Sequence, residues 1–175
     1  MLTVRTNGLI VLIQGIKVRS PININSLKKI LEKANSNNYV IQLIDADIVA
    51  SLHHLIAAII RTERSFHSKR NISHKKHVEL LLRLCGTRQI SDAIKIAGIK
   101  PDSVNVILIC YGKTECPHVK TILNMIDGDL ENNILYLNKE KRNKLIKIYN
   151  LPSSISDEDL IKYVLFKTSL IEIES

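Results

Sequence analysis

Aromatic residues are scarce in this sequence and tryptophan is absent, since phenylalanine, tyrosine and tryptophan make up 4% of its 175 residues. Proteins that bind single strands without sequence preference stack bases on aromatic side chains. A broad stacking platform is therefore not expected here. Any contact with nucleic acid should rest mainly on phosphate groups, with one or two bases held in pockets.

Long apolar runs are also missing. The longest stretches, LIVLIQGI and VNVILIC, have the length of strands, whereas a membrane helix needs about 20 apolar residues. The opening residues show no apolar segment ahead of the polar run that holds Thr3, Arg5 and Asn7, so no signal peptide is expected. We therefore predict no membrane contact.

The chain has an odd number of cysteines, namely Cys85, Cys110 and Cys116. Without a secretory signal, this set indicates a reduced protein. We expect a cytoplasmic protein, or also a nuclear one if the source is eukaryotic.

Motifs for catalysis and metal binding are absent. The six glycines are too scattered for a phosphate-binding loop or a dinucleotide fingerprint, and there is no G-x-S-x-G elbow. Cys110, Cys116 and His118 lie close in sequence but lack the spacing of a zinc site. Asp45 and Asp47 are explained more simply as helix caps than as paired catalytic carboxylates. No catalytic residue, metal or cofactor is expected.

Basic charge is what the chain has in excess, with 25 Lys and Arg against 17 Asp and Glu and a net charge of +8. This balance favours an anionic partner, either a nucleic acid or an acidic protein surface. The cations gather at helix ends and in one loop, at Arg61, Arg64, Lys69, Arg70, Lys75, Lys76, Arg83 and Arg88. The simpler alternative is an ordinary solvated surface.

Hydrophobic patterning predicts strands and helices in mixed order. Asn7-Gly8 between β-branched runs predicts a hairpin with a type I′ turn. Further strands are expected at 38–45, 103–110 and 134–137, with a turn at 127–133. Helices are expected at 23–36, 46–66, 75–85, 90–97, 116–126, 138–150 and 154–170.

The absence of a regular βαβ rhythm indicates how these elements assemble. We predict an α/β (α+β) fold, in which a mixed, largely antiparallel sheet of four to five strands packs with about seven helices. Residues 1–175 are expected to form a single domain. Asp45 or Asp47 should cap the helix 46–66, Asn71 or Ser73 the helix 75–85, and Gly86 should end the latter.

Five short motifs carry a resemblance to a known family: DAD at 45–47, HL at 54–55, RNIS at 70–73, VELLL at 78–82 and G-x-RQI at 86–90. Over residues 41 to about 110 the sequence closely resembles the small kinase-binding subunit of the KEOPS complex (TPRKB-like). The resemblance implies a non-catalytic role in a complex that makes the threonylcarbamoyl modification of tRNA adenosine. It implies docking on the N-lobe of the complex's small kinase/ATPase, an indirect link to the transferase subunit, and contact with the 3′ CCA end of tRNA.

The resemblance and the charge pattern together nominate site residues. Arg70, Asn71 and Arg88 match the motifs and are candidates for tRNA contact, and proximity and charge add Arg64, Lys69, Lys75 and Arg83. Thr87 stands where lysine would be expected. For the kinase we expect exposed apolar positions at Leu165, Leu170 and Ile171, and a face of small residues at Ala50, His54 and Ala57. Two alternatives stay open: a purely protein-binding regulatory subunit, and a small enzyme.

Overall fold

The computed structural model describes residues 1–35 and 38–173. The chain divides into two compact units, each built from two separate segments. Unit 1 comprises Met1–Ala46 and Ile99–Ile134, and unit 2 comprises Asp47–Gly98 and Leu135–Ser175. A single domain over residues 1–175 stays a prediction.

Unit 1 begins with the predicted hairpin, formed by β1 (Leu2–Thr6) and β2 (Leu9–Val18). Asn7 and Gly8 connect the strands with φ angles of 49° and 74°. Both turn positions are left-handed, as a type I′ turn requires, and this turn matches the natural twist of the two strands. The hairpin prediction is confirmed.

The sheet of unit 1 also contains β3 (Tyr39–Asp45), β4 (Asn105–Gly112) and β5 (Gly128–Leu130). The strand order is β1-β2-β4-β3, β5 pairs with β2, and every pairing is antiparallel. β4 lies in the middle of the order, and all of its residues from Val106 to Gly112 are buried, which explains its continuous apolar sequence. This five-stranded sheet and the seven α-helices of the described residues confirm the predicted α/β class.

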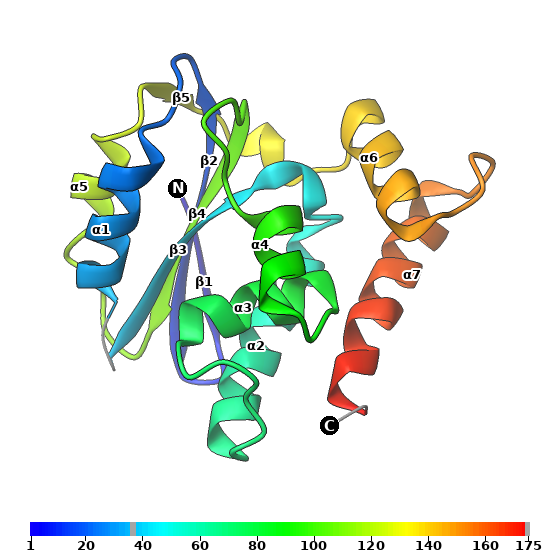
Figure 1. The fold of residues 1–175 in the computed structure, drawn as a ribbon, viewed down its shortest axis with the longest axis horizontal. Helices are drawn as coiled ribbons and strands as arrows, with labels where there is room; N and C mark the ends of the chain where they lie inside the picture. The colour runs from blue at the N-terminus through cyan, green and yellow to red at the C-terminus, as the bar shows by residue number, and fades with distance from the viewer. Residues whose placement is uncertain (36–37, 174–175) are drawn as a thin grey trace. The chain divides into compact units, whose positions relative to one another are not determined.

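Two helices, α1 (Ile24–Ala34) and α5 (Val119–Leu123), cover one face of this sheet (Figure 1). The Asn23 side chain caps α1 by accepting a bond from the Ser26 amide at 3.1 Å. Leu27 of α1 and Ile122 of α5 are buried in one cluster with the strand side chains Ile41 and Leu108. The helix expected at 23–36 is confirmed, while its last expected residue, Ser36, lies outside the described residues.

The segment after α5 differs from the prediction. The turn expected at 127–133 contains the strand β5, and the strand expected at 134–137 begins as a 3-10 turn, η2 (Asn132–Leu135). Gly15 of β2 explains the pairing, because the Glu131 amide donates to its carbonyl at 2.9 Å. A Cβ at Gly15 would lie 2.2 Å from the Glu131 carbonyl oxygen, so only glycine permits this approach. The helix expected at 116–126 is also shorter.

Unit 2 consists of helices, namely α2 (Leu52–His67), α3 (Lys76–Cys85), α4 (Ile90–Ala97), α6 (Lys139–Tyr149), α7 (Asp157–Ser169) and the 3-10 turn η3 (Leu170–Glu172). Helix α3 packs against α2, α4 and α7, and every residue from Glu79 to Cys85 is buried. The helix predicted at 75–85 is therefore present and is buried on most sides. Among the described residues, no helix combines the length and apolarity needed to cross a bilayer.

The N-terminal caps predicted for α2 and α3 are wrong, whereas Gly86 ends α3 as predicted. Helix α2 starts at Leu52, not at residue 46, because the Ser51 hydroxyl accepts the His54 amide at 3.1 Å, and Asp47 instead pairs with Lys144 of α6. The N-cap of α3 is Lys75, without a side-chain bond. Asn71 and Ser73 do not cap α3, since they bond within the preceding loop.

Candidate functional site

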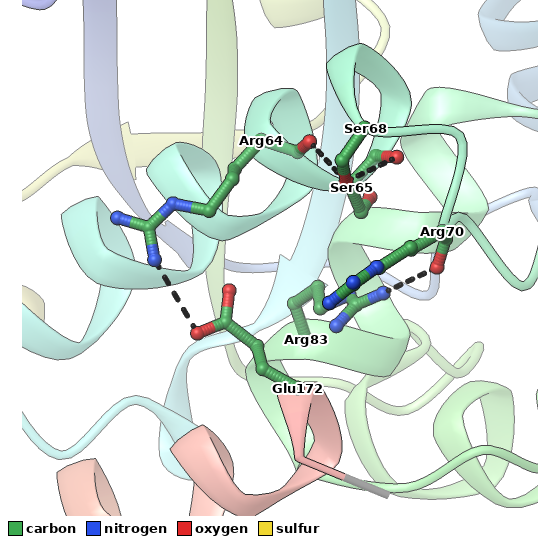
Figure 2. A pocket seen from close by; sticks show the side chains of 6 residues that line it. All are labelled: Arg64, Ser65, Ser68, Arg70, Arg83 and Glu172. Atoms are coloured by element: carbon green, nitrogen blue, oxygen red, sulfur yellow. Dashed lines mark hydrogen bonds and ion pairs between the residues drawn. The ribbon is translucent and has the colours of Figure 1, made fainter. Parts of the chain in front are cut away.

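A small cationic pocket lies in unit 2, with a volume of about 180 Å³. Three arginines, two serines and one glutamate line it, namely Arg64, Ser65, Ser68, Arg70, Arg83 and Glu172 (Figure 2). They come from the end of α2, the loop 68–75, helix α3 and the turn η3. Guanidinium groups are donors that bind phosphate or carboxylate oxygens, whereas the Ser65 and Ser68 hydroxyls donate to the Thr62 carbonyl at 2.8 Å and to the Arg64 carbonyl at 2.9 Å.

A buried ion pair underlies the pocket. Arg83 Nη2 lies 2.7 Å from Glu79 Oε1, and the two side chains are 2% and 0% exposed. The residues are four positions apart in α3, so they share one face of the helix. A buried carboxylate without its partner would be strongly unfavourable. Arg83 and Glu79 can therefore both stay charged in the interior because they are paired.

The same pair anchors the loop that carries Arg70. Glu79 Oε2 accepts the amides of Ile72 at 2.9 Å and Ser73 at 2.8 Å. Arg83 Nη2 donates to the Arg70 carbonyl at 3.2 Å, as Figure 2 shows. The loop backbone is therefore held from α3, while the Arg70 side chain remains exposed.

The opposite side of the pocket is formed by α2 and η3. Arg64 Nη1 lies 3.5 Å from Glu172 Oε2, with side-chain exposures of 64% and 27%. Nearby, Arg61 donates to the Thr168 hydroxyl at 3.0 Å and to the Leu165 carbonyl at 3.3 Å. Burial lowers the pKa of Arg61, Glu172 opposes that shift, and the like charges of Arg64 and Arg83 add to it. Positive charge is thus concentrated around one carboxylate.

Among the residues predicted for tRNA contact, the structure brings Arg64, Arg70 and Arg83 to the pocket. Arg83 was predicted to contact tRNA at the surface, but its guanidinium is buried against Glu79. The other four do not line the pocket: Lys69, Lys75 and Arg88 are exposed, and Asn71 is half-buried.

Exposure was expected at Leu165, Leu170 and Ile171, and at Ile171 it is wrong, because that side chain is 2% exposed. Ala50 and His54, predicted on a face of small residues that meets the kinase or an internal helix, are 0% exposed and pack in the interior. Ala50 also precedes α2 and so does not share its helical face. The remaining positions, Ala57, Leu165 and Leu170, are half-buried.

His54 connects two helices of unit 2 and is not a surface group. Its Nδ1 accepts the Ala50 amide at 3.3 Å, and its Nε2 lies 2.9 Å from the Leu84 carbonyl. A neutral ring protonated at Nε2 satisfies both contacts. Burial lowers the pKa of His54 to about 4, against a rise from the Leu84 hydrogen bond, with smaller reductions from Arg61 and Lys141.

The cysteines are buried free thiols. Burial raises the pKa of Cys85 to about 12. It also raises the pKa of Cys110, and Cys116 beside it adds to that shift. The thiolate is the nucleophilic form of cysteine, so neither Cys85 nor Cys110 is a nucleophile at neutral pH. Within residues 1–35 and 38–173, no cluster of three potential metal ligands occurs.

Two acidic residues of the site were missed from the sequence. Glu79 could have been found, because an acid and an arginine four residues apart in an apolar helix indicate a buried pair. Glu172 is separated from Arg64 by 108 positions, and no local pattern indicates that they meet.

The sequence matches the family model described as "Kinase binding protein CGI-121" over residues 21–170, and the chain belongs to that family. This confirms the resemblance to KEOPS kinase-binding subunits. It is 31% identical over 133 residues to "Regulatory protein Cgi121" of Methanocaldococcus jannaschii, covering 76% of this chain and 83% of that protein. It is 27% identical over 123 residues to "EKC/KEOPS complex subunit CGI121" of Yarrowia lipolytica, covering 70% of each.

Proposed function

We propose that this chain is a non-catalytic adaptor subunit of a KEOPS complex, which binds the small kinase/ATPase and recruits tRNA, chiefly through its 3′ CCA end. The family description and the names of the relatives support the kinase and complex part of the proposal. The raised thiol pKa values agree with a subunit that leaves the tRNA modification chemistry to the transferase and the kinase.

The cationic pocket is the observation that supports tRNA binding. Arg64 and Arg70 expose guanidinium groups at its rim, and the buried Arg83 contributes positive charge from below. Guanidinium and phosphate form charge-assisted, often bidentate hydrogen bonds. The pocket suits one phosphate group, and Lys69 in the adjoining loop extends the positive surface along a strand.

A titration of tRNA with charge-reversed variants tests the proposal. Arg64→Glu with Arg70→Glu should weaken tRNA binding by about tenfold or more and flatten its salt dependence, because phosphate contacts release counterions. The matched control is Lys147→Glu with Lys162→Glu, which makes the same charge change at exposed positions of α6 and α7. A tRNA without its CCA end should bind the unmodified protein less tightly.

The alternative is a purely protein-binding regulatory subunit, whose positive surface meets acidic protein. It would be favoured if tRNA binding were absent, or if the control variant lost as much affinity as the pocket variant. Equal binding of tRNA with and without CCA would remove the claim on the 3′ end while leaving phosphate contact in place.

A further inference from the structure

Glu172 is the one carboxylate among the residues that line the cationic pocket. Figure 2 shows it reaching from η3 toward Arg64. A site for phosphate gains nothing from an acid beside its arginines, because like charges destabilise the bound anion. The position of Glu172 therefore needs an explanation of its own.

The contact between Glu172 and Arg64 is weak. At 3.5 Å it exceeds the usual 2.7–2.9 Å of a charge-assisted bond. The Arg64 side chain is 64% exposed, and exposed pairs contribute little because water and salt screen them. A phosphate group that replaces the carboxylate at Arg64 therefore loses little there, while Glu172 stays near Arg61, whose pKa it raises.

The backbone that carries Glu172 is held more firmly than its side chain. Ile171 beside it is 2% exposed, and the Ile173 amide bonds the Leu170 carbonyl at 2.9 Å. Arg61 bonds the Thr168 hydroxyl at the end of α7. A change of side-chain rotamer at Glu172 would therefore free Arg64 without moving η3.

We propose that Glu172 is an internal competitor of RNA: its carboxylate occupies the place at Arg64 that a phosphate group of bound RNA takes. This inference rests on the proposed tRNA binding. An anion that binds at Arg64 displaces Glu172, so the lost pair reduces its affinity by a small factor. A strand with several phosphates is affected less, because contacts to neighbouring cations offset the lost pair.

The test compares Glu172→Gln with Glu158→Gln in a tRNA titration at several salt concentrations. Both variants remove one negative charge, but Glu158 is 77% exposed in the first turn of α7 and lies outside the pocket. Glu172→Gln should tighten tRNA binding by about threefold to fivefold at low salt. Its log–log salt slope should stay close to that of the unmodified protein, because both proteins contact the same phosphate groups once RNA is bound. Glu158→Gln should change the affinity less.

Two results would overturn the inference. Equal tRNA affinities for the two variants would mean that Glu172 does not compete. Weaker binding by Glu172→Gln would mean that the carboxylate contacts RNA directly, for example by accepting a base amino group. Thermal unfolding of both variants separates these results from a loss of folding.

A second probe separates this inference from the proposed function. Inorganic phosphate is titrated while the Arg side-chain N–H signals are followed by NMR. If no variant binds tRNA but Glu172→Gln binds phosphate more tightly than Glu158→Gln, the proposed function fails, while competition between Glu172 and phosphate at Arg64 remains supported. If the phosphate affinities are also equal, both fail.

Discussion

Three arginines line one pocket, but their charges meet different surroundings. Arg83 is 2% exposed and bonds to Glu79 in the interior of unit 2. Arg64 is 64% exposed and lies 3.5 Å from the Glu172 carboxylate, and Arg70 extends from a loop that Glu79 and Arg83 hold. At the scale of the residue, Arg83 acts by positioning, whereas Arg64 and Arg70 are available to a ligand.

His54 makes unit 2 sensitive to acid. Its pKa is about 4 in the folded protein and 6.5 ordinarily, so the unfolded chain takes up the proton first as the pH falls. The stabilisation is fully present above about pH 6.5 and is lost toward pH 4. We expect the free energy of unfolding to fall by on the order of 3 kcal/mol over this window through His54, measured by urea unfolding at each pH.

The variant His54→Gln should flatten this pH dependence, since its amide can still donate to the Leu84 carbonyl but does not titrate. The exposed His67 at the end of α2 provides the control. An equal effect of His54→Gln and His67→Gln on the pH profile would contradict the role assigned to His54.

At the scale of the element, the end of α3 is a tight contact. Gly86 stops the helix with a φ of 65°, and a Cβ there would lie 2.9 Å from the Thr168 Cα of α7. Both the left-handed backbone and the close approach require glycine. Helix α3 can therefore end against α7 and let the chain turn into α4.

Gly86→Ala should destabilise the protein by about 2–3 kcal/mol, the sum of backbone strain and a displaced neighbour. Gly8→Ala is the matched control, because Gly8 also has a positive φ, of 74°, but nothing within 4 Å of the added Cβ. It should cost about 1 kcal/mol. Urea unfolding of both variants measures the difference, and equal losses would argue against the contact with Thr168.

Elements with strong local signals could be predicted, and those that depend on a distant partner could not. The Asn7-Gly8 hairpin, the buried helix α3 and its stop at Gly86 follow from turn chemistry and periodicity. Strand β5 has only three residues and exists because it pairs with β2 beside Gly15.

The start of α2 was predicted too early in the sequence. Asp45, Asp47 and Ser51 are all residue types that cap helices, and in the structure the Ser51 hydroxyl accepts the His54 amide and caps α2.

The candidate site follows the same division at the scale of the whole molecule. The cations of residues 64–88 indicate a positive surface in the sequence itself. Which of them are exposed depends on packing around α3. Glu172 reaches the pocket only because η3 packs near α2, although it lies 108 positions after Arg64 in the sequence. The charge pattern therefore predicted which segment carries the site, but not which of its side chains line the pocket.

We predict that a second surface of unit 2 contacts the kinase. Ile90 and Ile94 of α4 are 41% and 50% exposed, and exposed apolar side chains are typical of a protein-binding patch. Helix α4 follows Gly86, which lies against Thr168 of α7, and the predicted Leu165 in the same helix is half-buried.

Ile94→Asp with Leu165→Asp should therefore weaken capture of the small KEOPS kinase by about tenfold or more, because a charge buried in an apolar interface is unfavourable. Capture is measured with purified kinase, and thermal unfolding checks that the variant folds. Ile148→Asp, at a 41% exposed position of α6, is the control. Loss of capture in the control, or full capture by the double variant, would contradict this surface.

The interleaving of the two units has a consequence for biosynthesis. Unit 1 lacks β4, its central strand, until the segment after Ile99 has been translated, and unit 2 lacks α6 and α7 until the segment after Leu135 follows. Domains generally fold during synthesis as their residues leave the ribosome. Here the nascent hairpin and helices α2 to α4 must wait for later segments, so this chain should depend on chaperones more than its length suggests.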